Sequence, residues 1–263
     1  MARSQYEIDE AWKELLAGEM TAMHRAKMAL RTIPSAPRCK LCLAPFGKPG
    51  GSILRLVGRG RWEGNPALCR ICIATLAKRS GGAEVELSVL FADVRGSTGV
   101  AERMSPADFR SLLNRFYQAA AQAVDKELGV VDKFLGDGVL ALFIPGIGGP
   151  DHAHQAIQAA SDILRATGNA SGEEHPWLPI GAGIHTGIAF VGSIGTAETF
   201  DFTALGDTVN TAARLGSIAE AGELLVSMQT AEAAHIDPSE LERRHLDLKG
   251  RSQPLDILVF RPR

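Results

Sequence analysis

The sequence VELSVLFADVRGST, residues 85–98, decides the fold of this chain. An almost unbroken apolar run ends at Asp93, and the small residues Gly96, Ser97 and Thr98 follow it. A run of this kind predicts a buried strand that leads into a tight turn with exposed backbone amides. Strand-like and helical patterns alternate from here onward, so we predict an α/β (α+β) domain with mixed strand pairing.

Toward the C-terminus, this pattern predicts a single domain over residues 83–263. The expected elements are a helix at 106–127, a hairpin at 129–144, a helix at 151–167, two strands within 178–195, a helix at 207–219, a strand at 223–227, a short helix, and closing strands at 245–250 and 255–260. No repeat or low-complexity tract interrupts the series.

Two smaller segments precede this domain. Residues 5–32 carry apolar side chains at roughly helical spacing and end before Pro34, which predicts one amphipathic helix within a segment 1–36. The pattern fits a helix packed on the body of the protein and equally a dimerising or signal-transmitting helix. Residues 37–82 hold all four cysteines and end in Ser-Gly-Gly, so they form a candidate module with its linker.

Charge and hydropathy narrow the function classes. The formal charge of -2 gives no general attraction to nucleic acid or anionic lipid, although it is compatible with local basic clusters. No apolar run reaches the roughly 18 residues that cross a bilayer, and the N-terminus lacks the pattern of a signal peptide. We therefore expect a cytoplasmic protein with neither a membrane nor a nucleic acid as its partner.

The cysteines form two C-x2-C pairs, Cys39 with Cys42 and Cys69 with Cys72. In a cytoplasmic chain this spacing favours a structural, tetrahedral zinc site with four cysteine ligands over disulfides. A turn-rich segment and an expected hairpin follow the first pair, and the second pair begins a helix, which resembles zinc-ribbon or treble-clef modules. An iron-sulfur cluster, a redox-active dithiol and a basic nucleic-acid face formed by Arg and Lys within 55–79 remain alternatives.

Two aspartates follow strands in a way that suits metal binding. Asp93 ends the first strand, and Asp137 lies in LGDG at the tip of the expected hairpin, where two glycines permit a tight turn. Taken alone, each aspartate has a position that is also typical of an ordinary turn residue without a metal-binding role. If their strands are neighbours in one sheet, the two carboxylates converge as a hard oxygen site for Mg²⁺, suited to two-metal phosphoryl chemistry.

A third segment adds a donor and a cation. In DFTALGDTVNTAARLGS, residues 201–217, Gly206 breaks the chain and a helix then presents Asn210 and Arg214 on one face. A neutral donor and a permanent cation aimed at one point suit a developing pentavalent phosphate.

In this order, FADVRGST, KFLGDG and TALGDTVNTAAR resemble the catalytic domain of class III adenylate and guanylate cyclases, and the likeness runs from about residue 85 to 262. The resemblance implies a ferredoxin-like βαββαβ core with a C-terminal extension. It also implies two Mg²⁺ or Mn²⁺ ions held by Asp93, Asp137 and the carbonyl of Val94, with the substrate phosphates near Gly96, Ser97 and Thr98.

The same resemblance assigns the nucleotide contacts. Lys133 stands where the family has its purine-selecting lysine and where guanylate cyclases usually carry Glu, so ATP is implied. Thr203 stands at the second purine-selecting position, where many adenylate cyclases have Asp, and marks the often bicarbonate-responsive class IIIb. Asn210 would position the ribose, Arg214 would offset phosphate charge, and Lys249, or alternatively Arg251, would reach the terminal phosphates.

Family members build each site across a head-to-tail homodimer, with the aspartates from one chain and the other catalytic side chains from its partner. The implied reaction converts ATP to 3′,5′-cyclic AMP and pyrophosphate through attack of the ribose 3′-hydroxyl on the α-phosphate. We therefore expect an adenylate cyclase. The alternatives are a guanylate cyclase, which Lys133 disfavours, and a catalytically silent nucleotide-binding regulatory module, which the intact motifs disfavour.

Overall fold

The computed structural model describes residues 5–33, 36–62, 67–77, 81–170, 176–196, 200–247 and 254–263. The chain divides into two compact units. The N-terminal unit combines Met1–Val85 with Pro145–Gly149 and Phe190–Ala204, and the sheet unit combines Glu86–Ile144, Pro150–Ala189 and Leu205–Arg263.

A mixed sheet carries the strands of the chain. Its order is β2-β3-β1-β4-β6-β8-β7, and β5 pairs with β4 beside this path. Strand β6 runs parallel to β4, whereas the β1–β3, β2–β3, β6–β8 and β7–β8 pairs are antiparallel, which confirms the mixed pairing. The strands are β1 Gly82–Val94, β2 Val130–Leu135, β3 Gly138–Phe143, β4 Ile180–Gly195, β5 Phe200–Leu205, β6 Leu224–Ser227, β7 Glu242–Leu246 and β8 Leu255–Phe260.

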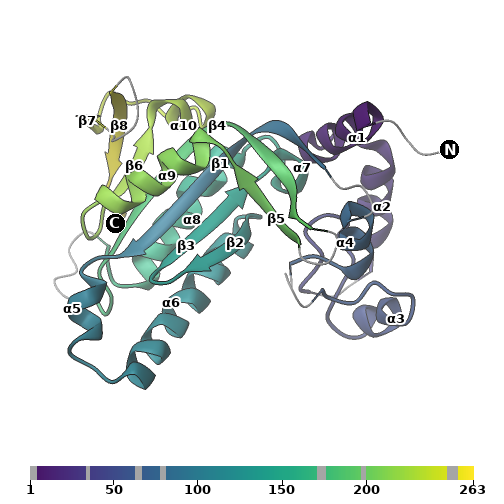
Figure 1. Ribbon diagram of the computed structural model, residues 1–263, viewed down its shortest axis with the longest axis horizontal. Helices are drawn as coiled ribbons and strands as arrows, with labels where there is room; N and C mark the ends of the chain where they lie inside the picture. Colours follow the sequence, from purple (N-terminus) through teal and green to yellow (C-terminus); the bar gives the residue numbers. More distant parts are fainter. Residues whose placement is uncertain are drawn as a thin grey trace. The chain divides into compact units, whose positions relative to one another are not determined.

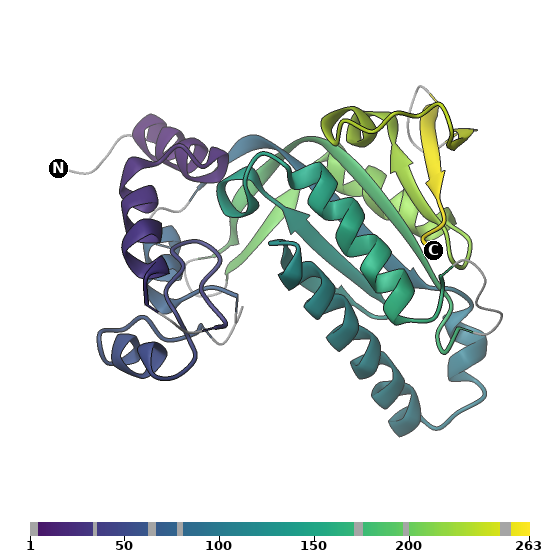
Figure 2. The same ribbon diagram turned by 180° about the vertical axis from the view of Figure 1, so that it is seen from behind.

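Helices cover both faces of the sheet in the sheet unit. Figures 1 and 2 show α6 (Pro106–Lys126) and α8 (His152–Ala166) on one face and α9 (Asp207–Ile218) on the other. Each face of the sheet has its own hydrophobic core. In β6, Leu224 and Val226 belong to the core under α6 and α8, whereas Leu225 belongs to the core under α9. Two short helices, α5 (Ser97–Ala101) and α10 (Met228–Ala233), complete this unit.

Glycines allow α9 to approach the sheet closely. A Cβ atom on Gly216 would lie 2.6 Å from the ring of Phe91 in β1, and one on Gly183 in β4 would lie 2.2 Å from the backbone nitrogen of Gly216. Such distances are too short for real Cβ contacts, so only glycine permits this packing. The glycine contacts therefore fix α9 against β1, the strand that carries Asp93.

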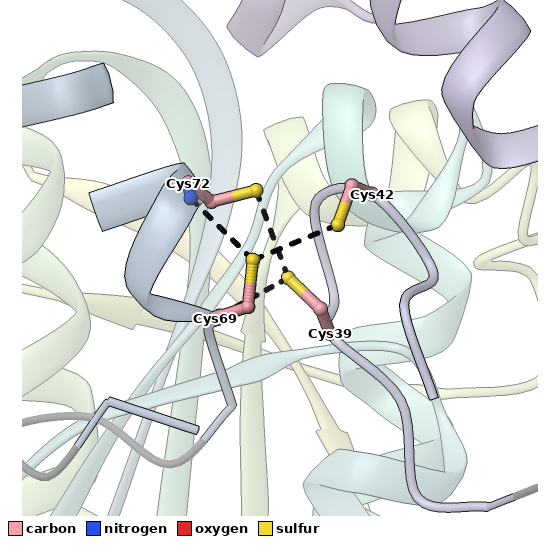
Figure 3. A group of neighbouring side chains, drawn as sticks. All are labelled: Cys39, Cys42, Cys69 and Cys72. Atoms are coloured by element: carbon pink, nitrogen blue, oxygen red, sulfur yellow. Dashed lines mark hydrogen bonds between the residues drawn. The ribbon is translucent and has the colours of Figure 1, made fainter. Parts of the chain in front are cut away.

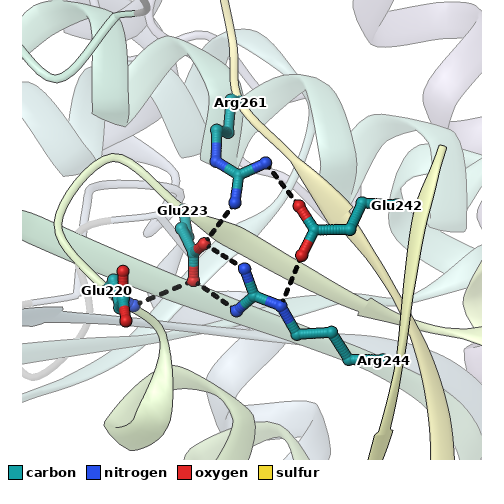
Figure 4. Close-up of polar contacts among 5 residues, drawn as sticks. All are labelled: Glu220, Glu223, Glu242, Arg244 and Arg261. Carbon is teal, nitrogen blue, oxygen red and sulfur yellow. Dashed lines mark hydrogen bonds and ion pairs between the residues drawn. The ribbon is translucent and has the colours of Figure 1, made fainter.

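An ion-pair network ties the closing strands to β6. Glu223, whose side chain is only 2% exposed, accepts hydrogen bonds from Arg244 at 2.9 and 2.6 Å and from Arg261 at 2.7 Å. Glu242 contacts the same two arginines at 2.7 Å each (Figure 4). The network balances a carboxylate that burial would otherwise destabilise.

The N-terminal unit corrects the expectation of one helix over residues 5–32. The structure has α1 at Gln5–Ala17 and α2 at Thr21–Arg31, because Gly18, in the left-handed region at φ +85°, ends the first helix. Lys27 of α2 donates a 2.8 Å hydrogen bond to the carbonyl oxygen of Gly146 in the short helix α7 (Pro145–Gly148). Both helices therefore pack within this unit.

Other expectations need correction too. Residues 50–56 form helix α3 (Gly50–Leu56) where a hairpin was expected after the first cysteine pair, whereas α4 (Arg70–Ala77) begins at the second pair as predicted. The region 178–195 forms one long strand, β4, and β5 was not foreseen. The hairpin at 129–144 and the helices after 106, 151 and 207 are confirmed. No helix within the described ranges is long and apolar enough to cross a membrane.

Candidate functional site

The two candidate metal-binding aspartates lie together at one edge of the sheet. Strands β1 and β3 are antiparallel neighbours in which Asp93 pairs with Gly138, and Asp137 directly precedes Gly138 in the turn between β2 and β3. The backbone nitrogen of Val94 donates a 3.2 Å hydrogen bond to the carbonyl oxygen of Asp137. The strand pairing therefore brings the aspartates together, as expected.

Burial and charge both act on Asp93. Its pKa is raised from the ordinary value, first by burial and then by the neighbouring charge of Asp137, although the cation Arg95 opposes the change. Arg95 donates to Asp93 Oδ2 at 2.6 Å and also holds the backbone carbonyls of Ser217 and Ala219. Carboxylate and backbone carbonyl oxygens are the donors that Mg²⁺ and Mn²⁺ prefer, so this edge fits a divalent ion.

The turn that carries Asp137 is supported by an aromatic residue that the sequence analysis missed. Tyr117 of α6 donates its hydroxyl hydrogen to the carbonyl oxygen of Gly136, which has φ +63°. The Tyr117 ring also stacks on Phe134 of β2, with centroids 4.3 Å apart. Its pKa is raised by burial and by the charge of Asp137. The role of Tyr117 is visible only from this hydrogen bond to Gly136, which lies 19 residues away in the sequence.

The small-residue turn after Asp93 also has the expected form. Gly96 has φ +66°, with no atom within 4 Å of the position that a Cβ would take, and precedes α5, which begins at Ser97 and includes Thr98. Gly96 and Thr98 are exposed, and Ser97 is partly exposed. This turn is therefore open to a ligand.

Helix α9 presents its polar pair as the spacing predicts. Asn210 is exposed, and Arg214, one turn later, is half-buried. Arg214 Nη1 is buried and has no hydrogen-bond partner among the residues that the structure describes. Thr208 Oγ1, which donates to the carbonyl oxygen of Ile188 in β4 at 2.6 Å, anchors the start of this helix. An incompletely paired guanidinium is suited to an anion supplied from outside the unit.

Comparison with known proteins identifies this arrangement. Residues 83–259 match the family described as the adenylate and guanylate cyclase catalytic domain. This chain belongs to the adenylate and guanylate cyclase family. An uncharacterised protein of Mycobacterium tuberculosis, Rv1318c, is 35% identical over 197 residues, which cover 70% of this chain and 35% of that protein. The chain thus spans about a third of the length of the curated relatives that it matches.

Two solved cyclases share the fold. The guanylyl cyclase Cya2 aligns with a TM-score of 0.61 and 29% identity over 68% of this chain and 93% of its own. The adenylyl cyclase CyaB from P. aeruginosa aligns with a TM-score of 0.59 and 31% identity over 69% of this chain and 97% of its own. The similar structures thus include both a guanylyl cyclase and an adenylyl cyclase.

The two purine-selecting candidates lie in different units. Lys133 lies on β2, the first strand in the sheet order, where its one-third-exposed side chain is 3.7 Å from Asp132. Thr203 lies on β5 in the N-terminal unit and is 6% exposed. Lys249 and Arg251, the candidates for the terminal phosphates, lie outside the described residues.

This chain also has a candidate metal centre in its cysteine module. Figure 3 shows the four sulfurs pointing toward one another, and all four lie within 4.8 Å of each other. Cys39 Sγ is 3.8 Å from Cys72 Sγ, and Cys42 Sγ is 3.7 Å from Cys69 Sγ. A tetrahedral zinc ion with Zn–S bonds of about 2.3 Å places its ligands about 3.8 Å apart, whereas a disulfide needs about 2.05 Å. The geometry therefore fits zinc.

Charges around the sulfurs support the same interpretation. Arg59 Nη1 donates to Cys42 Sγ at 3.4 Å, and the backbone nitrogen of Cys69 donates to Cys39 Sγ at 3.3 Å. The pKa of Cys39 is raised, chiefly by its contacts with Cys42 and Cys69. Burial lowers the pKa of Lys27, although nearby Cys39 and Cys42 oppose this change. Four crowded thiolates need a cation, which a bound zinc ion supplies.

Proposed function

We propose that this domain is an adenylate cyclase that converts ATP to 3′,5′-cyclic AMP and pyrophosphate. The observation that carries the proposal is the pairing of Asp93 with Gly138, which brings Asp93 and Asp137 to one edge of the sheet. Together with the carbonyl of Val94, these carboxylates would hold two Mg²⁺ or Mn²⁺ ions. When bound, such ions activate the attacking oxygen and offset the charge that develops on the phosphates.

The proposed reaction forms one bond and breaks one. The ribose 3′-oxygen bonds to the α-phosphorus, the bond from that phosphorus to the bridging oxygen breaks, and pyrophosphate leaves with the electron pair. The hydroxyl proton passes to solvent. The residues of this chain would orient the nucleotide: Asn210 the ribose, Arg214 the phosphate, and the turn at Gly96, Ser97 and Thr98 the remaining phosphate oxygens. Lys249 stays a prediction for the terminal phosphates.

The sites would form across a homodimer. Arg214 Nη1 is buried without a hydrogen-bond partner among the described residues, and Asn210 one turn earlier is exposed. A helix face with an incompletely paired cation favours a ligand shared with another chain. We therefore infer two equivalent sites in which one chain supplies the aspartates and its partner supplies Lys133, Thr203, Asn210 and Arg214.

Lys133 and Thr203 are the basis for proposing ATP as the substrate. Lys133 can donate to an adenine ring nitrogen, and the Thr203 hydroxyl can donate or accept. We expect the wild-type protein to turn over ATP faster than GTP with Mg²⁺ or Mn²⁺, and Lys133→Glu to lower kcat/KM for ATP at least tenfold. Arg110→Glu, an exposed charge reversal on α6, is the matched control and should change neither value.

Product analysis with both nucleotides separates the alternatives. Cyclic GMP as the main product would identify a guanylate cyclase. No cyclic product with either nucleotide and either metal would identify a silent nucleotide-binding module. A bicarbonate titration at fixed pH tests the regulation implied by Thr203.

The cysteine module would hold a structural zinc ion. The sulfur spacing of 3.7 and 3.8 Å supports this assignment, and the small module needs a metal to hold its segments together. The four free thiols also fit the reducing cytoplasm, where we propose that the protein works.

A further inference from the structure

A second concave site lies in the cysteine module, and its wall contains none of the proposed catalytic residues. Its cavity of about 330 Å³ has three arginines in its wall, Arg55, Arg61 and Arg70, together with the Phe46 ring and the glycine backbone at 58 and 60. All three arginines are exposed and can reach a ligand. Neither the cyclase reaction nor the zinc site uses this cavity.

The cysteine site helps to hold two of the three arginines, Arg61 and Arg70, in place. Residue Arg61 forms an isolated β-bridge with Cys69, and its guanidinium lies 5.2 Å from the centre of the Phe46 ring. The backbone nitrogen of Arg70 donates to the carbonyl oxygen of Gly60 at 2.9 Å, and Arg70 lies between Cys69 and Cys72. The segments that close the metal site therefore also form the wall of the cavity.

The charge of this module differs sharply from that of the whole chain. Residues 36–80 contain nine Lys or Arg residues and one acidic residue, Glu63, while the whole chain has a formal charge of -2. A zinc ion with four thiolate ligands carries a net charge of about -2, so it would lower the positive charge of the module by only about two. Strong positive charge concentrated in one small module attracts anions.

We propose that this three-arginine cavity binds the phosphate group of a phosphorylated anion. Guanidinium groups match phosphate oxygens with paired N–H donors, and several of them together favour a multiply charged group over a carboxylate. The phosphate belongs either to a free metabolite or to a phospholipid headgroup. The headgroup would gain additional contact, because Ile53, Leu56 and Val57 beside Arg55 are 65%, 88% and 62% exposed.

The test measures binding to the full chain with the Asp93→Asn and Arg214→Ala substitutions and without Mg²⁺, which removes a proposed metal ligand and the proposed phosphate cation from the catalytic site. Inorganic pyrophosphate is titrated by calorimetry at physiological salt. Flotation compares phosphatidylcholine vesicles with vesicles that also contain phosphatidylinositol phosphate. We expect saturable binding in at least one arm. Pyrophosphate binding identifies a free metabolite as the source, and flotation alone identifies the headgroup.

Variants then locate the binding. Arg55→Gln with Arg70→Gln should weaken it at least tenfold while leaving the zinc content at one ion per chain. If that pair loses zinc, Arg55→Gln alone, at an exposed position of α3, should weaken binding severalfold. Arg110→Gln removes one exposed charge from α6 and should have no effect.

Three results would overturn the proposal. One is the absence of saturable binding in both arms. Another is an Arg110→Gln variant that weakens binding as much as Arg55→Gln does. The third is binding only to a single-stranded oligonucleotide, which would indicate an extended basic surface and not a phosphate cavity.

Discussion

Trp12 of α1 stacks on Phe202 of β5, with ring centroids 6.1 Å apart and an interplanar angle of 15°. Both side chains are buried, at 1% and 4% exposure. Phe202 directly precedes Thr203, the proposed purine-selecting residue. The N-terminal helix therefore packs on the strand that carries part of the proposed nucleotide site.

This contact predicts a double effect of Trp12→Ala. Loss of a fully buried indole should destabilise the N-terminal unit by about 3–5 kcal/mol. Because Thr203 loses its support, the ratio of ATP to GTP turnover should also fall. Thermal unfolding and product analysis measure the two effects. Tyr6→Ala removes an exposed ring, at 74% exposure, from the same helix and is the matched control. Equal effects of the two substitutions would contradict the proposed coupling.

Much of the candidate metal edge could be predicted because its signals are local. A strand that ends at Asp93 and a two-glycine turn around Asp137 each leave a short pattern in the sequence. The pairing of β1 with β3, on which the convergence of the two aspartates depends, is visible only in the structure. The cysteine cluster followed equally directly from its spacing.

The missed features depend on contacts between distant residues. The hydrogen bond from Tyr117 to Gly136 and the stacking of Trp12 on Phe202 leave no periodic pattern. Arg95 lies two residues from Asp93, yet its pairing depends on the backbone conformation of the turn. The break at Gly18 was not predicted because apolar residues continue at helical spacing on both sides of it, and the left-handed conformation of Gly18 is visible only in the structure.

Glu223 gives the sheet unit an acid-sensitive contact. Burial alone would raise its pKa, but hydrogen bonds from Arg244, the Glu220 amide and Arg261 lower it below the usual 4.5. Stability from this group is therefore present above pH 4.5 and is lost as the pH falls through the lower folded value.

Glu223→Gln should thus cost about 3 kcal/mol at neutral pH, because two arginines lose their shared carboxylate. The variant should also lose less stability than the wild type as the pH falls from 4.5 through the lower pKa of folded Glu223. Urea unfolding at several pH values measures both effects. The control, Glu240→Gln, changes an exposed carboxylate. If its pH profile matches that of Glu223→Gln, the network does not act as described.

Metal removal should act first on the N-terminal unit. We expect one zinc ion per chain, four thiols that react only after chelation, and faster proteolysis within residues 36–77 of the metal-free protein. Cys42→Ser should reproduce these effects without a chelator. Metal analysis, thiol titration and limited proteolysis provide the measurements. If the purified protein contains no metal before any chelator is added and its four thiols react at once, the result would contradict a structural zinc site. Visible absorbance together with bound iron would favour an iron-sulfur cluster.

The most direct test of the central claim mixes two inactive variants. Asp93→Ala removes a proposed metal ligand and Arg214→Ala removes the proposed phosphate cation, so each variant alone should form almost no cyclic AMP from ATP and Mg²⁺. In an equal mixture, half of the dimers contain both chains and one intact site each, so activity should recover to about a quarter of the wild-type value. Substantial cyclisation by Asp93→Ala alone, or no recovery in the mixture, would contradict a shared two-metal cyclase site.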